Sequence, residues 1–162
     1  MQTKKLTTLS LLTALALILS FVESQLPPLT TIPGIKMGLP NVVVVFALYR
    51  QGGRAAAGLS LVRVALVSIL FGTAASFLYS LAGAALSFAG MLALKGTGRF
   101  SCVGVSVAGG VLHNVGQILM ASLLLETNIF AYYLPFLLIS GTAAGVVIGL
   151  LSAAMVRRIP MM

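Results

Sequence analysis

Three polar side chains that can bind a ligand lie together in an otherwise apolar stretch: His113, Asn114 and Gln117. They belong to the box Gly109–Gln117 inside an apolar run from about 102 to 125, and the histidine is the only one in the chain. His113 and Gln117 share one helix face because they are four residues apart. Polar groups at membrane depth are costly and usually face a bundle interior or a cavity. Two interpretations follow: the box holds a ligand, or it connects neighbouring helices.

Acid–base and metal chemistry have few residues to use. The chain has two acidic residues, Glu23 and Glu126, no aspartate, and the single cysteine Cys102. Paired carboxylates, carboxylate-bound magnesium and thiolate clusters therefore lack their residues. The segment 96–98 lacks the Gly-Lys-Ser/Thr ending of a phosphate-binding loop. We expect a protein that is not an enzyme and that uses no metal or cofactor.

The elements that position these groups are membrane helices. Hydrophobic residues make up 59% of the 162 residues and charged residues 7%, whereas a soluble domain carries about 25% charged residues. Lipid must therefore be the main solvent, and a chain of this length is best counted in spans of about 20 residues. We predict an all-α integral membrane protein, with residues 1–162 forming a single domain of six transmembrane helices. Their approximate spans are 6–22, 39–49, 55–71, 75–94, 102–125 and 129–156.

The first apolar segment has an alternative as a signal peptide, with 22–24 as a poor cleavage site, but it is longer than the usual signal core. Its small residues form two pairs spaced by four, Ser10 with Ala14 and Ala16 with Ser20. Such pairs let another helix approach closely, within this chain or on a partner.

Basic residues predict the orientation. With six spans both termini lie on one side, and that side receives eight of the ten basic residues: Lys4, Lys5, Arg50, Arg54, Lys95, Arg99, Arg157 and Arg158. The opposite side receives Lys36, Glu23 and Glu126. By the positive-inside rule the termini are cytoplasmic and the protein lies in the cell membrane. The net charge of +8 is then an insertion signal, which argues against a nucleic-acid partner.

The polar side chains concentrate in the outer half of the predicted bundle. At 1.5 Å per residue, His113 lies roughly 18 Å from the cytoplasmic end of its helix and Arg63 lies near the midplane. Tyr79 lies in the outer part of the fourth helix, and Lys36 and Asn41 belong to a proline-rich loop over the outer face. We predict a substrate cavity open to the outside, in which Lys36 and Arg63 favour an anionic or strongly hydrogen-bonding substrate.

Each of these residues also has a structural interpretation. Arg63 can hydrogen-bond helix ends, His113 and Asn114 can join helices, Lys36 can be a solvated loop charge, and Tyr79 can be an interfacial anchor. The convergence of donors from a loop and three helices in one half of an apolar protein favours the binding interpretation.

Four stretches carry a resemblance to a known family. They are Pro33–Asn41, Arg63, Phe77–Gly83 and the box Gly109–Gln117. They resemble the Gx transporter family, which is also labelled component I of heptaprenyl diphosphate synthase, and the likeness covers nearly the whole chain. That family is similar to the substrate-binding S components of energy-coupling factor (ECF) transporters.

The resemblance implies a six-helix protein that captures a small vitamin-like or precursor molecule from outside. Its first extracellular loop and later helices would form the site. The first helix would dock on a transmembrane T component driven by cytoplasmic ATPases. Carried over, the docking residues are Ser10, Ala14, Ala16 and Ser20, which only approximate the usual Ala-xxx-Ala pattern.

The enzyme label implies an alternative function, a non-catalytic membrane accessory of heptaprenyl diphosphate or quinone biosynthesis. Prenyl diphosphate synthases bind magnesium diphosphate through aspartate-rich motifs, and this chain has no aspartate. It therefore cannot be the catalytic subunit of that reaction type.

Overall fold

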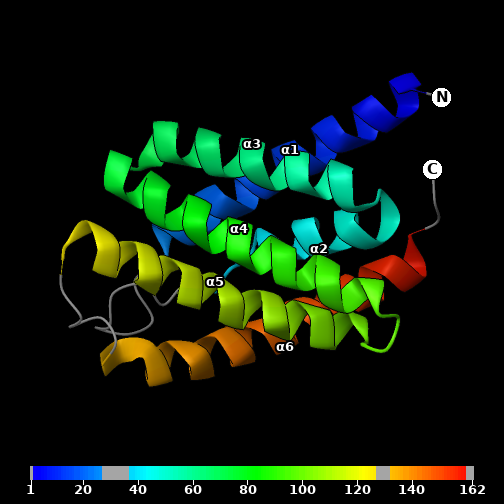
Figure 1. Ribbon diagram of the computed structural model, residues 1–162. Coiled ribbons are helices and arrows are strands. Elements are labelled where there is room, and N and C mark those ends of the chain that lie inside the picture. The colour runs from blue at the N-terminus through cyan, green and yellow to red at the C-terminus, as the bar shows by residue number, and fades with distance from the viewer. Residues whose placement is uncertain (1, 27–36, 127–131, 160–162) are drawn as a thin grey trace.

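The computed structural model describes residues 2–26, 37–126 and 132–159, and these fold into six helices (Figure 1). The prediction of an all-helical protein with six helices is confirmed. The helices are α1 Gln2–Gln25, α2 Asn41–Arg50, α3 Gly53–Phe71, α4 Ala74–Gly96, α5 Cys102–Leu124 and α6 Leu134–Arg158.

Short polar residues at the turns explain where two helices begin. Thr73 and Ser76 form a reciprocal capping box at the start of α4, in which each side chain accepts a hydrogen bond from the backbone N–H of the other. The hydroxyl of Ser101 accepts from the N–H of Gly104 at the start of α5. These bonds satisfy N–H groups that a helix leaves free in its first turn. Pro135 lies in the first turn of α6, where its missing N–H costs nothing.

Five of the helices, all except α2, are long and apolar enough to cross a membrane. The structure is therefore that of a multi-pass membrane protein. The expectation of six spans differs at α2, whose 10 residues extend over only about 15 Å. A bilayer core is about 30 Å thick. The described helix α6 begins at Leu134, and the predicted start of the last span at 129 lies outside the described residues.

The short helix α2 forms the centre of the protein. All residues from Val42 to Leu48 are buried. Every other helix contributes at least one buried side chain to the same hydrophobic cluster: Ala16, Ala56, Leu59, Met91, Val105 and Ile148. Seven successive apolar residues cover every face of a helix, as expected for a helix that has protein on all sides. The cluster fills one half of the bundle and leaves the other half to different side chains.

That half carries the positive charge, and we call it the basic end. Figure 1 shows both ends of the described chain, the α2–α3 turn and the α4–α5 turn at this end. The opposite end holds the α3–α4 turn and the C-terminus of α5. The Arg50 guanidinium donates from α2 to the carbonyls of Val156 and Ile159. Lys95 of α4 donates to the Leu48 carbonyl over 2.5 Å and lies 5.0 Å from the Tyr49 ring centroid.

Helices α4, α5 and α6 form a tightly packed layer in which α5 lies between its two neighbours (Figure 1). A Cβ added at Gly116 of α5 would lie 2.7 Å from the carbonyl oxygen of Ala82 in α4. On the other side, a Cβ at Gly145 of α6 would lie 2.6 Å from the Cα of Val107. Glycine is needed at both positions because any side chain would collide with the backbone of the neighbouring helix.

Candidate functional site

The polar side chains predicted to form a site lie at similar depths along their helices. Counted from the basic end at 1.5 Å per residue, Asn41 lies about 14 Å along α2, Arg63 about 15 Å along α3, and His113 about 17 Å along α5. All three side chains are half-buried. This is the level at which α2 begins.

His113 and Gln117 lie on the face of α5 that packs against α4. A Cβ added at Gly83 of α4 would lie 3.0 Å from both the Cε1 atom of His113 and the Cγ atom of Gln117. The expectation that these two residues share a helix face is therefore met, and Gly83 leaves room for both. Both residues are half-buried.

Asn114 lies on a different face of α5. Its Nδ2 atom donates to the carbonyl oxygen of Leu137 in α6 over 2.6 Å. The same atom would lie 2.8 Å from a Cβ added at Gly141. The amide nitrogen of Asn114 thus binds a neighbouring helix backbone, as in the helix-joining interpretation, while its neighbour His113 faces α4.

Glu23, for which only a place on the opposite side of the membrane was expected, contacts the segment just before α2. Its Oε1 atom accepts a hydrogen bond of 2.5 Å from the backbone N–H of Gly38, which has a φ of 72° just before α2. Ionisable residues inside membrane proteins are rare and usually have a partner. With only two acids in the chain, this rule was the signal that could have predicted an ordered contact for Glu23.

Arg63 has a buried donor in the middle of α3. Its Nε atom donates to no acceptor within residues 2–26, 37–126 and 132–159. A buried donor without an acceptor is costly, and a ligand or a water molecule at this atom would satisfy it.

Tyr79 and Lys36 are the remaining predicted site residues. Tyr79 lies in the second turn of α4 and is half-buried. Lys36 lies outside the described residues, so its role in substrate binding stays a prediction.

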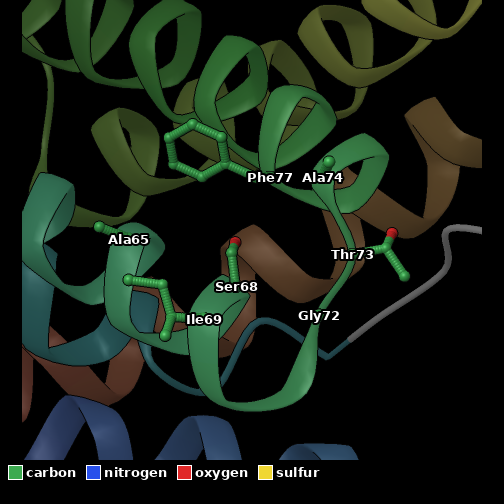
Figure 2. Close-up of a pocket in the computed structure, with 7 residues that line it drawn as sticks. All are labelled: Ala65, Ser68, Ile69, Gly72, Thr73, Ala74 and Phe77. Carbon is green, nitrogen blue, oxygen red and sulfur yellow. The ribbon is translucent and has the colours of Figure 1, made fainter.

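A hollow of about 400 Å³ lies between the opposite-end halves of α3 and α4 (Figure 2). Its lining consists of Ala65, Ser68, Ile69, Gly72, Thr73, Ala74 and Phe77. None of the predicted site residues that the structure describes borders it. With two hydroxyl groups and no charge, it is an apolar depression rather than a polar binding site.

The structure divides the predicted docking residues of α1 into two pairs. Ser10 and Ala14 are exposed, whereas Ala16 and Ser20 are buried. The Ser20 hydroxyl donates to the Ala16 carbonyl over 2.8 Å. The first pair is free to meet another protein, and the second packs inside this one.

The chain matches the family model described as heptaprenyl diphosphate synthase component I over residues 12–155. The chain belongs to this family, which is also called the Gx transporter family. The match runs from the second half of α1 to the last turns of α6, so it includes α2 and the polar groups around it. Component I names a non-catalytic component of that synthase. Neither a curated protein nor a solved structure matches the chain.

Proposed function

We propose that this protein is the substrate-capturing membrane subunit of an ECF-type importer. It lies in the cell membrane with its termini in the cytoplasm, because the basic end then obeys the positive-inside rule. It takes a small organic molecule from the outside, and partner subunits with ATPase activity drive its uptake.

One observation carries this proposal: polar side chains from four helices, Glu23, Asn41, Arg63 and His113, lie around the level where the buried helix α2 begins. Transporters place substrate sites near the midplane, next to helices that are interrupted there. Here α2 corresponds to the interrupted helix, because its 10 residues extend through only part of the bundle. The substrate occupies the half of the bundle beyond its start, where Gln117 joins His113 in orienting it.

The exposed pair Ser10 and Ala14 is the docking position for a T-type transmembrane partner. Small residues four apart let a second helix approach closely, and the lipid-facing side chains of Leu11 and Ile18 nearby are 68% and 59% exposed. Ala16 and Ser20 contribute indirectly, because they pack α1 against the other helices of this protein.

Purification from the native membrane tests the proposal. We expect a small molecule to remain on the wild-type protein, detected by mass spectrometry after extraction, and T-type and ATPase subunits to co-purify. His113→Ala and Gln117→Ala should each lower the retained amount, while Leu119→Ala, at a 61% exposed position of the same helix, should not. The proposal would be contradicted if the purified wild type carried no retained molecule and no partner subunits.

The family name favours a second function, that of a non-catalytic membrane accessory of heptaprenyl diphosphate synthesis. This function predicts co-purification with a soluble prenyltransferase and unchanged uptake of small molecules when the protein is deleted. The same purification separates the two, because a prenyltransferase and an ATPase pair are different partners.

A further inference from the structure

The apolar hollow between α3 and α4 lies at a depth where the surrounding medium is hydrocarbon. Both helices are long and apolar enough to cross a membrane. Counted from Gly53 at 1.5 Å per residue, the lining extends from about 18 Å to about 29 Å along α3, which falls within a bilayer core of about 30 Å. Ile69, which lines the hollow, and its neighbour Leu70 are 78% and 59% exposed. The hollow is therefore open to lipid and not to water.

Small side chains create this hollow, and the packing of α4 keeps it open. Ala65 and Ser68 of α3 face the ring of Phe77 in α4 across the space (Figure 2). On its other side α4 lies against α5, where a Cβ added at Gly83 would be only 2.8 Å from the carbonyl oxygen of His113. A shift of α4 towards α3 would close the hollow, but it would also break this close backbone contact.

We propose that the hollow binds the acyl chain of a phospholipid from the leaflet away from the basic end. Protein interiors are close-packed, and apolar side chains beside an empty space lose their dispersion contacts. The volume of about 400 Å³ is ample for hydrocarbon, since an apolar cavity of about 150 Å³ already holds a benzene ring. The lining contains no charged group, as suits a chain that has none. The bound chain thus supplies the contacts that the small side chains do not make.

Photolabelling in vesicles tests this assignment in the full-length protein. The probe is phosphatidylcholine with a diazirine in one acyl chain, diluted into ordinary phosphatidylcholine, and peptide mapping by mass spectrometry locates the adducts. In the wild type, adducts should form at Ala65 and Phe77, which are half-buried. Lipid that only surrounds the protein should label exposed side chains such as Leu123, which is 72% exposed, and should not reach the half-buried walls of the hollow.

A variant that fills the hollow provides the second part of the test. Ser68→Leu extends an apolar side chain into the space and should abolish the adducts at Ala65 and Phe77. Thr142→Leu is the matched control, because it replaces a hydroxyl side chain by leucine at an exposed position of α6 and should leave these adducts unchanged. If Ser68→Leu does not yield folded protein, Ala65→Leu fills the hollow from the same helix and should abolish the adduct at Phe77. Wild-type adducts confined to exposed positions, or adducts that persist in the filled variant, would overturn the assignment.

Discussion

Adjacent residues of the box Gly109–Gln117 contact different helices. His113 and Gln117 face α4 near Gly83, whereas Asn114 donates to the backbone of α6. A helix turns by 100° per residue, so successive polar side chains cannot share one surface. The helix-joining interpretation therefore holds for Asn114, whereas ligand binding by His113 and Gln117 stays a prediction.

Asn114→Ala should destabilise the protein by about 0.6–1.7 kcal/mol, the range measured for hydrogen bonds between membrane helices. Ligand retention per folded molecule should stay unchanged, because the side chain binds α6. Unfolding in mixed detergent micelles, followed by circular dichroism, measures the first quantity. Leu123→Ala is the control, since its side chain is 72% exposed. Equal stability of the two variants would show that the bond to Leu137 contributes nothing.

At the scale of helices, contact between α4 and α5 depends on glycine. Gly116→Ala places a Cβ 2.7 Å from the Ala82 carbonyl oxygen, and such overpacking costs about 1–3 kcal/mol. Gly104→Ala in the same helix meets nothing closer than 3.7 Å. It should stabilise the helix by up to about 1 kcal/mol through its better propensity.

Unfolding measurements should show a loss of stability for Gly116→Ala and a gain of stability for Gly104→Ala. Both substitutions make the same chemical change in α5, so propensity alone would give the same sign. A stabilised Gly116→Ala variant would mean that α4 and α5 are farther apart than described.

Apolar length and turn residues were sufficient to predict most helices. The spans 55–71, 75–94 and 102–125 differ from α3, α4 and α5 by at most two residues at each end. Composition did not predict that α2 is enclosed. Hydrophobicity reports burial from water, and lipid and protein neighbours satisfy it equally.

The candidate site was predictable in its residue types but not in its contacts. Depth counting placed Arg63 and His113 near the same level, because rise per residue is fixed. The direction of each side chain depends on helix rotation, which the sequence alone does not give for apolar helices with little amphipathic contrast. For that reason the contact of the Glu23 carboxylate with the Gly38 N–H appeared only in the structure.

At the scale of the whole molecule, three helix C-termini meet at the basic end. The carbonyl groups there carry partial negative charge, and cations stabilise them. Arg50 donates to the end of α6 and Lys95 to the end of α2. These two cations thereby hold the central helix between its neighbours.

Arg50→Met should destabilise the folded protein by about 1.5–3 kcal/mol, the usual contribution of a charged hydrogen bond. Arg54→Met removes the same charge from an exposed position in the first turn of α3. Its effect should stay below about 0.5 kcal/mol. Chemical unfolding in detergent compares them, and similar losses would assign the effect to net charge rather than to the bonds with α6.

Orientation in the membrane can be measured with single cysteines in a Cys102→Ala background. Arg99→Cys lies at the basic end and Glu126→Cys at the opposite end, and both positions are exposed. In intact cells a membrane-impermeant maleimide should label Glu126→Cys, whereas Arg99→Cys should require permeabilisation. The cysteine-free parent gives the background, and the reverse pattern would invert the proposed topology.

The enclosure of α2 also has a consequence for how the protein is made. Its 10 residues are too few to be recognised as a membrane segment on their own. The Ser152 hydroxyl and the Val156 carbonyl, which bind Val42 and Arg50, belong to α6, which is synthesised after α2. The central helix therefore reaches its final place only after α6 has been made. Until then the nascent protein carries an apolar segment that is too short to span the bilayer and has no complete set of helix neighbours.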